Sequence, residues 1–110
     1  MRKATVLYKK EAAGALAQND DGSFVFRYFD TWFANPLKPS ISLTLAKTQK
    51  EYYSQNLFPF FYNMLPEGSN KQLVCWQNRI DEKDDFGLLL ITAENDTIGA
   101  VSVIKTDTEV

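Results

Sequence analysis

The stretch GALAQNDDGSFVFRYF, at positions 14 to 29, decides the fold. Its centre, Asn19 to Gly22, is made of residues that favour tight turns, and it separates two apolar segments. After the turn the side chains alternate, so that Phe24, Phe26 and Tyr28 share one face of a strand. The stretch therefore predicts a β-hairpin whose second strand is aromatic on one face.

Other segments predict further strands. Ala4 to Tyr8 reads as a strand, and Ala12 to Ala17 reads as its partner, with Gly14 at a position where a side chain would be crowded. In the segment from Ile41 to Leu45, apolar residues alternate with Ser and Thr, which predicts a half-buried fourth strand. The last clear strand is predicted over Ile98 to Ile104.

Between the fourth and last strands the signals become helical. Pro59 suits the first turn of a short helix, which Pro66 ends because it disfavours the helical conformation of the residue before it. Ser69 or Asn70 can cap a second helix. Its apolar residues recur at spacings of three and four, which places them on one face of a helix: Leu73, Trp76 and Ile80.

A third helix is predicted to begin at Phe86, capped by Asp84 or Asp85, with Ala93 at the end of its apolar stripe. A turn at 94–96 follows it. The order of strands, helices and a final strand predicts the α+β class. We expect an antiparallel sheet or small open barrel, with two to three short helices between the fourth and last strands.

The bulk composition limits the possible functions. The 110 residues fit one domain, expected over 1–105, followed by a polar tail at 106–110. The 14 acidic and 12 basic residues give a net charge of −2, which argues against direct nucleic-acid binding. There is one cysteine, so no intrachain disulfide can form, and no apolar run is long enough to span a membrane. A cytoplasmic protein is expected.

The sequence contains no complete catalytic or phosphate-binding motif. The chain has no histidine, which removes the commonest general base and metal ligand. PEGSNK at 66–71 has too few glycines for a phosphate-binding loop, and its residue types suit a joint between two helices. Asp85-Phe86-Gly87 matches the DFG triplet of protein kinases, but the other kinase motifs are missing, so the match is a coincidence. The acidic run at 81–85 is typical of a solvent-exposed surface together with a helix cap. Cys75 reads as a buried, inert thiol. We expect a binding or structural module, with no catalytic, cofactor-binding or metal-binding residue.

The aromatic content is high for so small a chain: fifteen residues are Phe, Tyr or Trp. Most are expected in the core. The segment FVFRYF carries aromatic residues on both faces, however, and Trp32 and Phe33 follow it closely. A small sheet cannot bury both faces without a partner, and aromatic residues often anchor protein interfaces. A partner surface is therefore the alternative for some of them.

Several segments resemble one known family. FFYNMLPEGSNKQL is similar to the F-x-N-L-L-P-E-G signature in the N-terminal subdomain of HipA-type kinases, the toxins of bacterial toxin–antitoxin systems. GALAQNDDGSFVFRYFDTWF, PSISLTL and DDFGLLLITAENDTIGAVSV resemble other segments of that subdomain in the same order. The resemblance covers about Gly14 to Val103. It departs from the family at Thr44 and Ala46, at the Asn70-Lys71-Gln72 start of the second helix, and at Asn95.

The resemblance implies a freestanding N-terminal subdomain without the longer catalytic region of these kinases. It implies an antitoxin that binds a separately encoded HipA-like Ser/Thr kinase and inhibits it. The alternative is a structural subunit that completes or activates such a kinase, or links it to a helix-turn-helix, DNA-binding HipB-like partner. The expected partner-binding residues come from the exposed aromatics and the LPEG joint: Trp32, Phe33, Leu65, Pro66, Glu67, Gly68, Asn70, Lys71 and Trp76.

Overall fold

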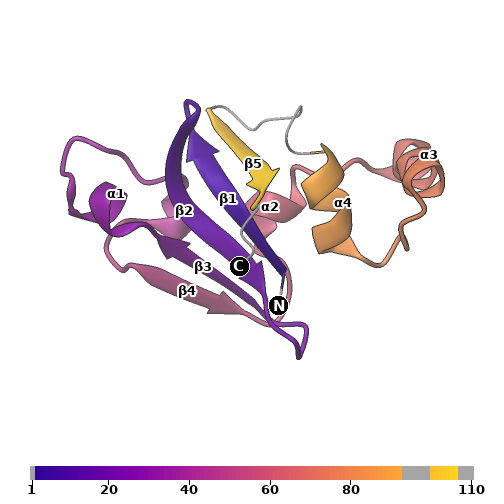
Figure 1. Ribbon diagram of the computed structural model, residues 1–110, viewed down its shortest axis with the longest axis horizontal. Coiled ribbons are helices and arrows are strands. Elements are labelled where there is room, and N and C mark those ends of the chain that lie inside the picture. Colours follow the sequence, from indigo (N-terminus) through magenta and orange to yellow (C-terminus); the bar gives the residue numbers. More distant parts are fainter. Residues whose placement is uncertain (1, 93–99, 107–110) are drawn as a thin grey trace.

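The computed structural model describes residues 2–92 and 100–106. Its centre is a five-stranded antiparallel sheet with the strand order β4-β3-β2-β1-β5 (Figure 1). The strands are β1 (Arg2–Tyr8), β2 (Glu11–Gln18), β3 (Phe24–Tyr28), β4 (Glu51–Ser54) and β5 (Val101–Lys105). The helices are α1 (Asp30–Ala34), α2 (Pro59–Tyr62), α3 (Gly68–Asn78) and α4 (Asp85–Thr92). The predicted α+β class is confirmed, with three helices between β4 and β5.

The hairpin of β2 and β3 forms as the sequence predicts. Gln18 pairs with Phe24, and Gly22 has a φ of +90°, a conformation that suits glycine. The Asp21 carboxylate accepts hydrogen bonds from the hydroxyl and the backbone N–H of Ser23, and these bonds lower the pKa of Asp21. The turn is therefore fixed by local contacts, which is why its sequence signal was clear.

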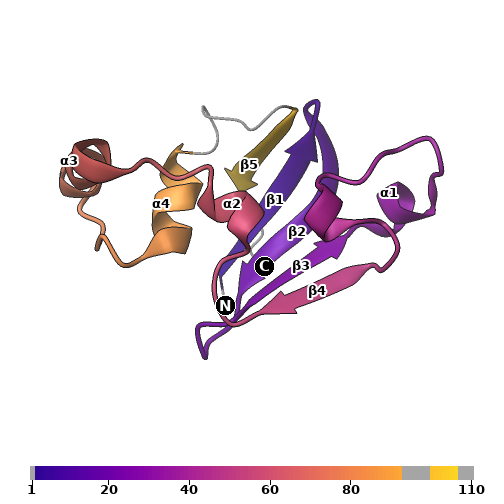
Figure 2. The ribbon, with the colours of Figure 1, turned by 180° about the vertical axis from the view of Figure 1, so that it is seen from behind.

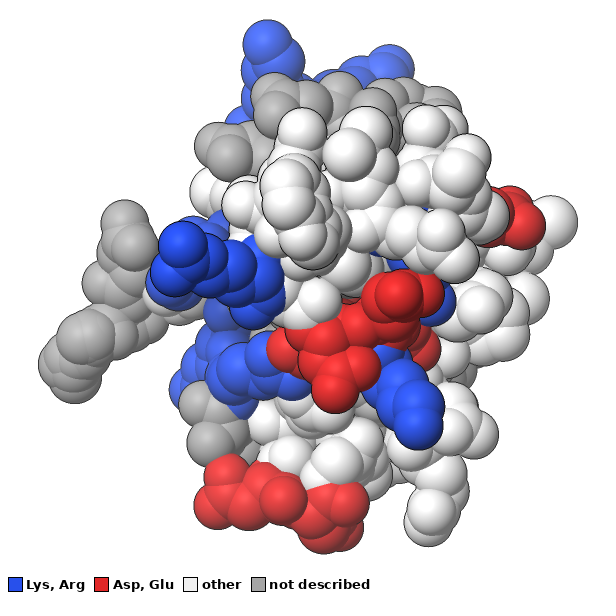
Figure 3. All heavy atoms as spheres, turned by 90° about the vertical axis from the view of Figure 1, so that its right-hand side faces the viewer, with Lys and Arg blue, Asp and Glu red and all other residues white. Residues whose placement is uncertain are grey.

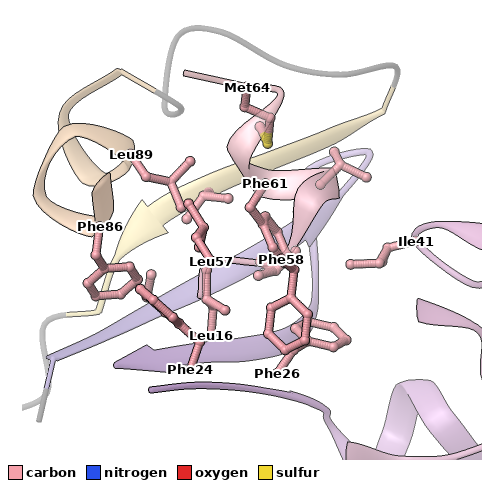
Figure 4. Close-up of a cluster of buried hydrophobic side chains, with 14 of the residues drawn as sticks. Leu16, Phe24, Phe26, Ile41, Leu57, Phe58, Phe61, Met64, Phe86 and Leu89 are labelled. Atoms are coloured by element: carbon pink, nitrogen blue, oxygen red, sulfur yellow. The ribbon is translucent and has the colours of Figure 1, made fainter. Parts of the chain in front are cut away.

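The core lies on one face of the sheet. Figure 2 shows α2 in front of the sheet. Figure 4 shows aromatic rings from the sheet and the helices meeting in the core, and the closest of them make edge or tilted contacts, such as Phe26 with Phe61 at 6.0 Å. The largest fully buried side chains of this layer are Leu16, Phe26, Tyr28, Phe61, Phe86, Leu88 and Leu89. On the opposite face of β3, Arg27 is exposed and Val25 is partly exposed, so β3 is covered mainly on one side.

The predicted strand from Ile41 to Leu45 is wrong. This segment ends in a single 3-10 turn, η1 (Leu43–Leu45), and the fourth strand is Glu51–Ser54 instead. Ser42 Oγ accepts the N–H of Thr44 and begins the turn. Ile41 and Leu45 are both buried, whereas Leu43 is 98% exposed. The alternation therefore reflects a turn fixed at both ends, and not the two faces of a strand.

The Tyr28 hydroxyl holds this turn in place. It donates to the carbonyl of Leu45 and accepts from the N–H of Ile41 at 3.0 Å. The ring is fully buried, and burial raises the pKa of Tyr28. Both ends of the segment from Ile41 to Leu45 are thus joined to β3 through one oxygen atom.

We expect Tyr28→Phe to lower the free energy of unfolding by about 1 to 2 kcal/mol, because the buried N–H of Ile41 and carbonyl of Leu45 lose their shared partner. Urea denaturation followed by circular dichroism measures this change. Tyr53→Phe is the matched control, because Tyr53 is 71% exposed and should lose almost nothing. If the two variants are equally stable, the hydrogen bonds of the Tyr28 hydroxyl to Ile41 and Leu45 do not stabilise the fold.

The start of α4 is tied to β1 through Arg2. Its guanidinium donates to both oxygens of Asp84, at 2.7 and 3.0 Å, and lies 5.2 Å from the centre of the Phe86 ring. Asp84 also accepts the N–H of Gly87, which confirms the predicted cap. The hydrogen bonds from Arg2 are the main reason that the pKa of Asp84 is lowered. Phe86 is fully buried, so the kinase-like triplet here serves the fold.

We expect Asp84→Asn to lower the free energy of unfolding at pH 7 by roughly 0.5 to 1 kcal/mol, a small value because both side chains are partly exposed. Because the pKa of Asp84 is lower in the folded chain than its unfolded value of 3.8, the charged carboxylate stabilises the fold at any pH above 3.8. This stabilisation is lost as the pH falls through the pKa of Asp84 in the folded chain. The difference between variant and parent should therefore disappear in acid. Urea titrations from pH 7 to pH 2 measure the unfolding free energies of both chains. If their difference stays constant over this range, the negative charge of Asp84 does not stabilise the fold.

The final strand was predicted over Ile98 to Ile104, and the structure places β5 at Val101–Lys105. The predicted turn at 94–96, Ala93 and residues 107–110 of the predicted tail lie outside the described residues. Thr106, the first residue of that tail, donates its N–H to the carbonyl of Lys3 at 3.4 Å.

Candidate functional site

The joint between α2 and α3 forms a pocket. The backbone leaves α2 at Tyr62, passes Pro66 and enters α3 at Gly68, whose φ of +59° suits a residue without a Cβ. The pocket has a volume of about 330 Å³. Its lining residues are Tyr62, Asn63, Leu65, Pro66, Glu67, Gly68 and Lys71, which we call the joint pocket. Five of the nine predicted partner-binding residues are among them.

The joint pocket combines apolar, polar and charged groups. Tyr62 is 51% exposed, and Glu67 is exposed as well, so both can reach a partner. Leu65 is only 8% exposed and belongs largely to the core. Glu67 occupies the position before α3, and its side chain makes no capping hydrogen bond. Neither Ser69 nor Asn70 caps the helix as predicted, because the helix begins at Gly68 and both lie within its first turn.

The predicted apolar stripe of α3 is largely exposed. Leu73 is 52% exposed and Trp76 is 79% exposed, whereas Cys75 on another side of the helix is 2% exposed. Figure 1 shows α3 at the far end of the molecule, beyond α4 and away from the sheet. The periodicity correctly identified a stripe of apolar residues, but no other element of the described chain covers Leu73 and Trp76. We call these two residues the α3 face.

The sequence-predicted residues fall into two separate groups. Trp32 and Phe33 lie on α1, at the opposite end of the molecule from α3 (Figure 1). Trp32 is 3% exposed, donates its indole N–H to the carbonyl of Pro39 at 2.9 Å and packs against Tyr8. Phe33 is half-buried against Tyr28. The burial of Trp32 places it in the core, whereas Trp76 is exposed on α3, the helix that begins at the joint pocket.

Two residues of the site were missed by sequence reasoning. Tyr62 and Asn63 line the joint pocket but were not among the predicted partner-binding residues. A signal for Tyr62 was present, because a tyrosine after Phe60 and Phe61 places a hydroxyl where the helix leaves the core. Leu73, on the α3 face, was predicted as part of the helix stripe but not as a partner-binding residue, because nothing in the sequence distinguishes a stripe that meets the core from one that meets another protein.

Among residues 2–92 and 100–106, no three His, Cys, Asp or Glu side chains gather as a metal site would require. Cys75 is a buried free thiol, as predicted. Across the same residues, the helices are too short or too polar to cross a bilayer. The arrangement is suited to binding through exposed apolar and polar side chains.

Comparison with known proteins gives consistent matches. The family described as "HipA N-terminal domain" matches residues 4–104. A protein of Haemophilus influenzae is 35% identical, over 94% of this chain and 92% of its own length. "Putative kinase Y4dM" of Sinorhizobium fredii is 30% identical over 94% of this chain but only 27% of its own length. The chain thus spans about a quarter of this longer relative.

Two solved structures share the fold. The "N-terminal domain of HipA toxin" is 31% identical with a TM-score of 0.70, over 99% of this chain and 96% of that one. A chain in the complex of HipA, HipB and operator DNA from Shewanella oneidensis has a TM-score of 0.74 and 17% identity. That match covers 97% of this chain and 24% of the other, and at this identity it shows the fold alone.

Proposed function

The chain belongs to the HipA N-terminal domain family, and we propose that it is a non-catalytic module that binds a separately encoded HipA-like serine/threonine kinase core. The binding surface is the joint pocket together with the α3 face. In this proposal the chain inhibits the kinase and acts as an antitoxin in the cytoplasm.

The observation that carries the proposal is the exposure of the α3 face. A tryptophan that is 79% exposed beside a half-exposed leucine leaves apolar surface in water, which is costly for an isolated domain. Tryptophan is also the residue most enriched among those that dominate binding energy. The joint pocket, next to the start of α3, adds the charged groups of Glu67 and Lys71, which can fix the orientation of a partner.

The longer relative supports the choice of partner. The same domain makes up about a quarter of a protein named as a kinase, so it occurs there in one chain with a larger remainder. A separate chain with this fold can make the same kind of contact with a kinase core across two molecules. The Haemophilus influenzae relative, with which this chain aligns over 92% of that protein's length, shows that the domain also occurs in proteins of about this size.

The alternative function is a structural subunit that completes or activates the kinase core, or links it to a HipB-like DNA-binding protein. The structure from Shewanella oneidensis that shares this fold is a complex of HipA, HipB and operator DNA, and it motivates this alternative. In this case the link to DNA runs through the partner, because the net charge of −2 gives this chain no general attraction to phosphates.

A phosphorylation assay of the kinase core, with and without an excess of this chain, separates the two functions. The proposed antitoxin lowers the rate of phosphate transfer in proportion to the fraction of kinase bound. A higher rate on addition supports the completing subunit instead. A complex without any change in rate would contradict inhibition and leave the tethering role.

A further inference from the structure

A hollow beside Trp76 combines an aromatic side chain with charged ones. It lies between the second half of α3 and the loop that follows, and its volume is about 560 Å³. Its lining residues are Gln72, Cys75, Trp76, Ile80, Asp81, Glu82 and Lys83. None of the residues of the joint pocket is among them, so this hollow, the Trp76 hollow, is a separate feature.

The backbone at the end of α3 forms the hollow. Arg79 adopts a left-handed conformation with a φ of +57°, and the N–H of Ile80 donates to the carbonyl of Cys75 at 2.9 Å. This C-terminal cap turns the chain back past the helix. Asp81 Oδ1 accepts the N–H of Lys83 at 2.9 Å and fixes the next turn. Asp81 and Glu82 therefore line the same hollow as the exposed indole.

The charge of the hollow is negative. Its lining holds two carboxylates, from Asp81 and Glu82, against the one ammonium group of Lys83. Among the described residues, the ion pairs of the chain involve neither carboxylate. Figure 3, which views the α3 end of the molecule, shows acidic side chains gathered beside a broad uncharged area, with basic side chains on either side of them.

Together these features favour one type of occupant. The face of an indole attracts a cation, and a guanidinium can also form paired hydrogen bonds with a carboxylate. An apolar, neutral side chain would bring no positive charge to the two carboxylates, and an acidic segment would be repelled. We propose that the Trp76 hollow binds an arginine or lysine side chain from a basic segment of the protein partner. This inference rests on the proposed function and names the chemistry of the partner.

The test compares the affinity of the kinase core for the parent chain and for the double variant Asp81→Asn/Glu82→Gln, by titration calorimetry at low and high salt. We expect the double variant to bind about tenfold more weakly at low salt and to show a flatter dependence on salt. Glu51→Gln is the matched control, because Glu51 is an exposed carboxylate on β4 outside the Trp76 hollow, and it should bind like the parent.

Three outcomes overturn the inference, and they are distinguishable. If the parent chain binds the kinase core and the double variant binds equally well at both salt concentrations, the basic contact is wrong while the proposed function stands. If the folded parent chain does not bind the core at all, the proposed function fails and this inference fails with it. Tighter binding by the double variant would show that the partner presents acidic groups here.

Discussion

Trp76→Ala is expected to weaken binding of a HipA-like kinase core by about 30-fold or more, the equivalent of at least about 2 kcal/mol. The indole is 79% exposed in the isolated chain, so the fold does not depend on it. The unfolding free energy should therefore change by less than about 0.5 kcal/mol. A large loss of affinity without a loss of stability is the signature of a residue that serves a partner.

Leu37→Ala provides the matched control for this variant. Leu37 is 88% exposed and is also apolar, but it lies in the loop after α1, at the end of the molecule far from α3. Calorimetric titration of the kinase core with both variants makes the comparison. If Trp76→Ala and Leu37→Ala bind as tightly as the parent chain, the α3 face is not the binding surface.

Gly14→Ala is expected to lower the free energy of unfolding by about 2 to 3 kcal/mol, in the upper part of the range for overpacked sites. Gly14 is buried in β2, opposite Tyr28. A Cβ at this position would lie 2.6 Å from the carbonyl oxygen of Arg27 and 2.9 Å from the ring of Phe26. The backbone of Arg27 cannot rotate away as a flexible side chain could, so the sheet or the core must shift.

Urea denaturation measures the effect, with Gly22→Ala as the comparison. A Cβ on Gly22 meets no atom within 4 Å, although its φ of +90° carries a conformational cost of about 1 kcal/mol. Gly14→Ala should therefore lower the free energy of unfolding more than Gly22→Ala does, because only the Cβ at position 14 clashes with neighbouring atoms. A Gly14→Ala variant as stable as the parent would mean that β2 and β3 are not packed as described.

The parts of the fold that were predictable are those fixed by local chemistry. The hairpin depends on turn residues at 19–22 and on the alternation after Phe24, and both are visible in the sequence. Pro59 begins α2 as expected, because its fixed φ suits the first helical turn. Asp84 caps α4 for a similar reason, since its carboxylate reaches the N–H of Gly87 three residues on.

The parts that were not predictable depend on distant contacts. The strand Glu51–Ser54 is polar, and it exists because Glu51 pairs with Arg27 and Ser54 pairs with Phe24 across the sheet. Ile41 to Leu45 was read as a strand because its alternation fits one, but the Tyr28 hydroxyl bends it into a turn. Local pattern alone cannot decide between these two conformations.

The candidate site was predictable at the joint and not beyond it. Pro66 and Gly68 have residue types that suit a joint between helices, and the structure places both in the joint pocket. Trp32 and Trp76 look alike in the sequence as candidates for a surface. Their exposures of 3% and 79% arise from where α1 and α3 pack, which is a property of the whole fold.

The central claim is that this chain binds a HipA-like kinase core, and capture of the tagged protein from its own cells tests it most directly. The captured proteins are identified by mass spectrometry, with the Trp76→Ala chain captured in parallel. The account predicts a HipA-like kinase with the parent chain and a strongly reduced amount with the variant. Folded, expressed parent chain that captures no such kinase would contradict the account.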